Sequence, residues 1–170
     1  MSTETPPVSE RSRVVTWDDP FAAAELAKTM SGMELFEAML AGKVSAPPIA
    51  SLMDFQLASA EVGKVVFTCE PNESHYNPIG VVHGGLVCTL LDSVAGCAVH
   101  STLPKGQAYT SLEIKVSYLR PVTVDSGTLT ATGIVTKPGR RAAFADATVT
   151  DSQGRLVATA SSTCLVFPIE

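Results

Sequence analysis

The chain has 170 residues, of which 45% are hydrophobic and 17% charged, and its formal net charge is −5. A chain of this length and composition is expected to fold as one compact domain, which excludes a mostly disordered or fibrous protein. The negative charge excludes a general attraction to nucleic acid or to an anionic membrane surface, although it permits a local phosphate pocket.

The amino-terminal segment, residues 1–16, is polar, charged and proline-containing, and we expect a flexible arm before a single domain over residues 17–170. The arm has no apolar run of the kind that a secretory signal needs. The four cysteines form no C-x-x-C pair and no metal-ligand cluster with the histidines, so we interpret them as buried side chains in a reducing compartment. These features predict a cytoplasmic protein without a metal site.

The first predicted elements are short. Apolar side chains recur at helical spacing over residues 31–41, which predicts an amphipathic helix. Pro47 and Pro48 are expected to end that helical region. A strand is expected next, over residues 62–70.

A strongly apolar segment, residues 84–99, predicts a long helix that is hydrophobic on nearly every side. It is shorter than the roughly 20 residues that a membrane span needs, and it carries Asp92 near its middle. We therefore interpret it as a helix buried inside the domain.

Four strands are predicted downstream. Residues 109–119 alternate between apolar and polar side chains, the period-two pattern of a half-buried strand. Turn sequences then separate three runs rich in Thr, Val and Ala, at residues 128–136, 141–150 and 155–167, which predicts an antiparallel meander. The predicted fold class is α+β, with one long central helix wrapped by a curved antiparallel sheet of five to six strands and an extra N-terminal helix.

The loop from Asn77 to Gly85 runs into the amino terminus of the predicted long helix, where the first N–H groups have no partner within the helix. Gly84 and Gly85 let a substrate approach the backbone closely, and the Gly84 N–H can donate to a carbonyl oxygen as negative charge develops on it. The alternative is structural: the glycines permit a tight turn, and His83 caps the helix or lies in the core. The sequence leaves both open.

Asp92 lies in the most apolar segment of the chain. A carboxylate there costs several kcal/mol unless it is paired or hydrogen-bonded. One interpretation makes Asp92 a general base or nucleophile whose setting tunes its reactivity. The alternative is that Asp92 caps a neighbouring loop or pairs with a Lys or Arg side chain.

The spacing of Gly84 and Asp92 restricts how they can cooperate. They are eight residues apart on one helix, which corresponds to about 12 Å along its axis. A base and an oxyanion donor that serve one carbonyl carbon must both lie within about 3 to 4 Å of it. If both residues are catalytic, the site is composite, which predicts an obligate symmetric homodimer with two equivalent sites.

Together these segments resemble a known family. The run from Asn77 through His83-Gly84-Gly85 to Asp92, followed by a strand that ends Tyr-Leu-Arg-Pro, is similar to the hotdog-fold acyl-CoA thioesterases of the PaaI (phenylacetate-degradation) type. The resemblance covers about residues 31–168. It implies hydrolysis of an acyl-CoA to a free acid and coenzyme A, with no metal or redox cofactor, by a dimer or a dimer of dimers that forms a homotetramer.

The resemblance also implies roles for five residues. Asp92 would be the catalytic carboxylate, which attacks directly or activates water, and the Gly84 N–H would polarise the thioester carbonyl. Asn77 would hold the carbonyl or the water through its amide, and His83 would orient the loop and the substrate. Ser111 matches a position at which some relatives position the water with a hydroxyl.

Two features of the resemblance concern other residues. Some relatives carry a hydroxyl residue one helical turn after the carboxylate, where this chain has Gly96, so Ser111 would have to position the water. The phosphates of coenzyme A call for a local basic group, for which Arg140 and Arg141 are candidates. The alternative for these arginines is a solvated hairpin tip. Gly85 is a candidate substrate contact because it has no side chain.

Two other functions stay open. A non-catalytic acyl-CoA-binding hotdog protein would share the fold, but the sequence shows no added helix-turn-helix segment or basic DNA-binding stretch. An acyl-CoA hydratase would also share it, but hydratases of this fold place their catalytic Asp and His close together, whereas His83 and Asp92 cannot meet within one chain. The acyl group, whether aromatic, short-chain or medium-chain, does not follow from the sequence.

Overall fold

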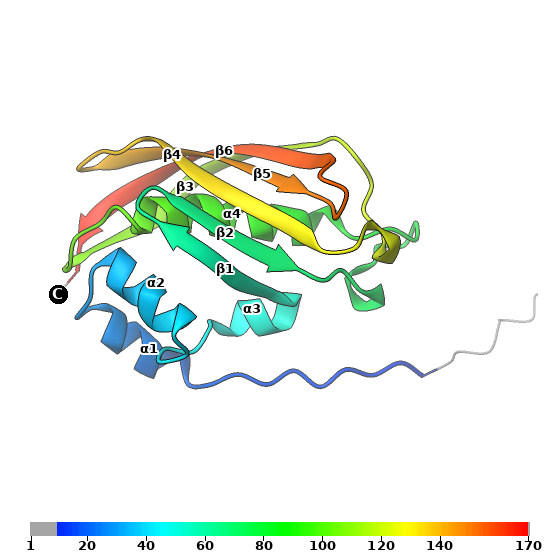
Figure 1. The fold of residues 1–170 in the computed structure, drawn as a ribbon, viewed down its shortest axis with the longest axis horizontal. Coiled ribbons are helices and arrows are strands. Elements are labelled where there is room, and N and C mark those ends of the chain that lie inside the picture. Colours follow the sequence, from blue (N-terminus) through cyan, green and yellow to red (C-terminus); the bar gives the residue numbers. More distant parts are fainter. Residues whose placement is uncertain (1–9, 170) are drawn as a thin grey trace, which may run out of the picture.

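In a computed structural model that describes residues 10–169, six antiparallel strands form one sheet against which a long helix packs (Figure 1). In chain order the elements are α1 (Pro20–Ala27), α2 (Gly32–Leu40), α3 (Pro48–Met53), β1 (Phe55–Glu61), β2 (Lys64–Cys69), η1 (Glu73–His75), α4 (Gly84–His100), β3 (Gln107–Tyr118), η2 (Val124–Ser126), β4 (Leu129–Lys137), β5 (Ala142–Thr150) and β6 (Leu156–Pro168). The strand order is β1-β2-β4-β5-β6-β3.

Helix α4 forms the centre of the core because it is apolar on nearly every side. Leu90, Leu91 and Val94 are completely buried between the helix and the sheet. The two elements approach closely at Gly133 of β4, where a Cβ atom would come within 2.1 Å of the Val94 carbonyl oxygen. The predicted buried helix is confirmed.

Three helices precede the sheet, and they lie together beside β1 in Figure 1. The predicted amphipathic helix is α2, which begins with a capping box in which Ser31 and Glu34 each accept the other's backbone N–H. Pro48 does not merely end a helical region, because it is the first residue of α3. Proline suits that position, where its missing N–H would have no helical partner.

The sheet differs from the predicted meander in two ways. Strand β1 was not expected, and it forms an antiparallel hairpin with β2. Strand β3 does not pair with β4, because it lies at the sheet edge and pairs with β6. The connection from β3 to β4 is long enough to contain the turn η2, and it carries the chain across the sheet.

The predicted flexible arm lies partly outside the described residues, which exclude residues 1–9. Residues 10–16 run in an extended conformation. Arg13 donates hydrogen bonds to the Ser51 carbonyl oxygen at 2.7 Å and to Asp54 Oδ1 at 2.6 Å. No helix in the described part of the chain is long and apolar enough to cross a membrane.

Candidate active site

Asp92 and Ser111 are brought together where α4 passes beneath the edge strand β3. The Ser111 hydroxyl donates a hydrogen bond of 2.8 Å to Asp92 Oδ1. A β-bulge interrupts the pairing of β3 with β6 between Ser111 and Glu113. Bulges re-aim side chains next to them, and this one stands beside the hydroxyl that holds the carboxylate.

The groups around the inner side of Asp92 stay neutral at physiological pH. Burial raises the pKa of the Cys97 thiol to about 12, and it raises the pKa of Tyr109 well above its usual range. The pKa of Cys164 is also raised, mainly by burial. The nearby Asp92 carboxylate adds to each of these shifts. A carboxylate among neutral groups keeps its charge available for a reacting water or carbonyl.

The amino terminus of α4 is built by His83 and the two glycines. His83 is the N-cap residue, and its Nδ1 accepts the Gly85 N–H at 2.8 Å. A Cβ atom on Gly85 would come within 2.8 Å of that Nδ1. Gly84 is the first helical residue, so its N–H has no acceptor inside the helix. This leaves the Gly84 amide as a donor for a ligand.

Asn77 organises the loop that precedes the helix. Its Oδ1 accepts the N–H groups of Ile79 at 3.0 Å and Val81 at 3.3 Å. The loop is tied further by the His83 N–H, which donates to the His75 carbonyl oxygen at 2.7 Å. The side-chain oxygen of Asn77 is therefore used within the loop, and its Nδ2 is the group that can face a substrate.

Two residues that the sequence did not single out contribute to this region. The Tyr118 hydroxyl, from the end of β3, donates to the Gly84 carbonyl oxygen at 3.0 Å and ties the helix terminus to the sheet edge. His75 lies buried below the loop, where its Nδ1 accepts the Asn72 N–H at 3.2 Å. Tyr118 had a signal in the sequence, since it ends the alternating strand, but its partner could not be read from spacing.

Gly96 is explained by close packing. A Cβ atom on Gly96 would come within 2.4 Å of the Tyr109 ring. The space one turn after Asp92 is thus filled by Tyr109 from β3, and a hydroxyl residue would not fit there. Ser111 is the hydroxyl that the structure provides to Asp92 instead.

The predicted site residues fall in different hollows of the chain. Asp92 lines a hollow with Ser111 and also an apolar cavity, whereas Gly84 lines a hollow with Tyr118. Arg140 lies in a further hollow near the carboxyl end of α4, and Arg141 is exposed beside it. One chain therefore does not bring Gly84, Asp92 and the arginines to one point.

Comparisons with known proteins agree with this architecture. The sequence model of the Thioesterase superfamily matches residues 79–158. Acyl-coenzyme A thioesterase 13 of Homo sapiens is 31% identical over 135 residues, which cover 79% of this chain and 86% of the human protein.

Two solved structures share the fold. A phenylacetic acid degradation-related protein from Ralstonia eutropha, a putative thioesterase, is 28% identical with a TM-score of 0.70, covering 76% of this chain and 98% of its own. The E. coli PaaI protein from the phenylacetic acid degradation operon has a TM-score of 0.69 and 23% identity, covering 82% of this chain and 94% of its own.

A long helix wrapped by a six-stranded antiparallel sheet, with a Gly-Gly turn at the start of the helix, defines a hotdog-fold protein of the PaaI-like class. The chain belongs to the thioesterase superfamily, and it is a thioester hydrolase. The fold class and the family that the sequence predicted are both confirmed.

Proposed function

We propose that the chain hydrolyses an acyl-CoA thioester to a free acid and coenzyme A, with Asp92 as the general base. The observation that carries this proposal is the hydrogen bond from Ser111 to Asp92. It fixes one carboxylate oxygen and leaves the other for a water. The name of the human relative supports coenzyme A as the thiol.

The chemistry needs only groups that the protein itself supplies. Asp92 takes a proton from water as the water oxygen bonds to the thioester carbonyl carbon, and the carbonyl electrons move onto its oxygen. The N–H of Gly84 of the partner subunit donates to that oxyanion. Collapse of the intermediate breaks the carbon–sulfur bond, and the thiolate takes the proton from Asp92 as coenzyme A leaves. No metal or redox cofactor takes part in this scheme.

The edge strand supplies the geometry for a shared site. β3 is the last strand of the sheet, so one side of its backbone has no neighbouring strand among the described residues. Antiparallel pairing of β3 with a second copy about an axis between Ile114 and Lys115 would place Ser111 of one chain opposite Tyr118 of the other. Tyr118 holds Gly84 and Ser111 holds Asp92, so this pairing completes each site.

The proposed activity is tested by release of coenzyme A from a panel of acyl-CoAs, followed with a thiol reagent. Asp92→Asn is expected to lower kcat by at least 1,000-fold with the fold intact, since the proton acceptor is lost and general-base catalysis contributes on the order of 10² to 10⁴. Wild-type activity in Asp92→Asn would overturn the mechanism. An acyl adduct on Asp92 in rapidly quenched enzyme would make it the nucleophile instead.

The shared site is tested with two substitutions of Gly84. Gly84→Pro removes the N–H, and proline is tolerated at the first position of a helix. Gly84→Ala keeps the N–H and serves as the matched control, with a Cβ contact of 3.2 Å to the Tyr118 ring. Mixed dimers of inactive Asp92→Asn and Gly84→Pro chains should regain activity, because one of their two sites is intact. Verified mixed dimers without activity would contradict the shared site.

The same assay separates the two alternative functions. An acyl-CoA-binding protein would bind the thioester without releasing the thiol. A hydratase would add water to an enoyl-CoA and leave the thioester intact. Release of coenzyme A that depends on Asp92 is expected only of the thioesterase.

A further inference from the structure

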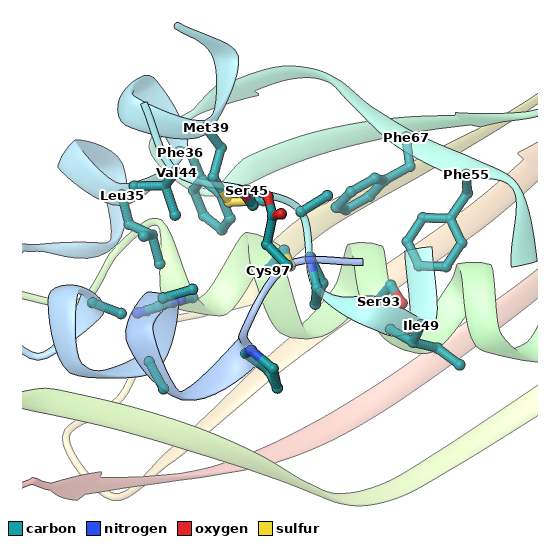
Figure 2. A pocket seen from close by; sticks show the side chains of 18 of the residues that line it. Leu35, Phe36, Met39, Val44, Ser45, Ile49, Phe55, Phe67, Ser93 and Cys97 are labelled. Atoms are coloured by element: carbon teal, nitrogen blue, oxygen red, sulfur yellow. Dashed lines mark hydrogen bonds between the residues drawn. The ribbon is translucent and has the colours of Figure 1, made fainter. Parts of the chain in front are cut away.

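Behind Asp92 lies an apolar cavity of about 380 Å³ that the catalytic scheme does not use. Its floor is α4, represented by Ser93 and Cys97, and its roof is formed by α1 and α2. Figure 2 shows side chains of α2, such as Phe36 and Met39, pointing toward it from the side opposite α4. Ligand pockets of this size are apolar with a few polar groups, as this cavity is.

The cavity runs along α4 from the carboxylate toward the end of the helix. Asp92 lines it at one position and His100 lines it two turns later, which corresponds to about 12 Å along the helix axis. His100 contacts Tyr109 and Phe36, with ring centroids 5.5 and 5.7 Å apart. Burial lowers the pKa of His100, so its ring is neutral and closes the far end without charge.

The roof over this cavity is made of small side chains. Ala23, Ala24 and Ala27 of α1 line it, and α1 contributes no fully buried residue to the core. A helix that buries nothing of its own while presenting alanines to a hollow covers space rather than filling it. The hollow lies next to the carboxylate that would act on the thioester carbonyl.

Resting on the proposed function, we propose that this cavity binds the acyl chain of the substrate and that Ala23 and Ala27 determine its length. An extended chain advances about 1.2 Å per bond, from the ~3.5 Å span of a three-bond residue. Roughly ten bonds therefore reach from Asp92 to His100. The substrate class is a medium-chain acyl-CoA.

The test fills the roof. In Ala27→Phe, kcat/KM for decanoyl-CoA should fall at least tenfold while that for butyryl-CoA stays within twofold, because one methylene in such a pocket already changes kcat/KM by about 10- to 200-fold. Ala23→Phe is the second variant, in case Ala27→Phe does not fold. Ala22→Phe, on the exposed side of the same helix, is the matched control and should change neither value.

A binding measurement keeps this inference separate from the proposed activity. Decanoate should bind wild type and Ala22→Phe in calorimetric titration, and its affinity should fall at least tenfold in Ala27→Phe. If wild type released no coenzyme A but decanoate binding changed in this way, the proposed function would fail and the acyl cavity would stand. Equal effects of Ala27→Phe on butyryl-CoA and decanoyl-CoA, or unchanged decanoate binding, would overturn the inference.

Discussion

At the scale of single residues, Asp92 depends on one neighbour for its orientation. Ser111 donates to Oδ1 at 2.8 Å, and a hydrogen bond to a charged group is worth about 1.5 to 3 kcal/mol. Without it the carboxylate can rotate away from the water that it activates. Ser111 is a positioning residue in this mechanism, since it acts through Asp92.

Ser111→Ala is therefore expected to lower kcat about 10- to 100-fold and to change KM little, as measured by coenzyme A release. Ser111→Thr keeps the hydroxyl and should retain most of the activity. Ser117→Ala, an exposed serine on the same strand, serves as the control. Wild-type kcat in Ser111→Ala would show that the carboxylate is oriented by other contacts.

Gly96 offers a second test at this scale, because its space belongs to Tyr109. Gly96→Ala would place a Cβ atom within 2.4 Å of the Tyr109 ring and should destabilise the protein by about 1 to 3 kcal/mol, as overpacking does. Urea unfolding measures this change. The cost should shrink in the background of Tyr109→Leu, since residues in contact do not behave additively. An equal cost in both backgrounds would contradict the contact.

At the scale of elements, the end of α4 combines two opposing effects on His100. The helix dipole favours a protonated histidine at a carboxyl terminus, by about 0.3 to 2 kcal/mol. Burial between α2 and β3 disfavours the charge, and it prevails because the pKa of His100 is lowered. His75, facing Asp54 and Arg13, also has a pKa lowered mainly by burial.

Stability should therefore decline as the solution becomes mildly acidic. Below the unfolded histidine pKa of about 6.5, the unfolded chain binds protons that the folded chain does not, so the free energy of unfolding falls from pH 6.5 toward the lower folded pKa. It should be constant with respect to these groups above pH 6.5. His100→Phe, measured by urea unfolding from pH 8 to pH 5.5, should flatten part of this decline. An unchanged profile would show that His100 does not contribute.

The elements also show what the sequence could and could not predict. Hydrophobic continuity was enough for α4, and alternation was enough for β3, because each pattern is local. Strand β1 was missed because it is half-exposed and follows α3 without a break. The place of β3 beside β6 could not be read from turn spacing, since it depends on a long connection that crosses the sheet.

The candidate site divides in the same way. Asp92 was identified because a carboxylate in an apolar helix is costly, and this reasoning needs no neighbours. Its hydrogen bond with Ser111 and the occupation of the Gly96 space by Tyr109 join segments that are far apart in the chain. Such pairings depend on the register of β3 against α4, which spacing along the sequence does not determine.

At the scale of the whole molecule, the edge of the sheet is the surface on which the proposed shared site depends. Leu112 is 61% exposed and Tyr118 is 54% exposed, both on β3. Exposed apolar side chains on an unpaired edge strand favour pairing with a second copy. Pairing there would bury Leu112 close to the hollow that Asp92 and Ser111 line.

Leu112→Lys should therefore weaken the dimer and lower activity in parallel, because edge lysines oppose strand pairing. Sedimentation velocity measures the assembly, and coenzyme A release measures activity across the same range of protein concentration. Ile134→Lys, at an exposed apolar position on β4 away from this edge, is the matched control and should leave both unchanged. A Leu112→Lys chain that is monomeric and fully active would show that each subunit has a complete site of its own, which the two-turn separation of Gly84 and Asp92 on α4 opposes.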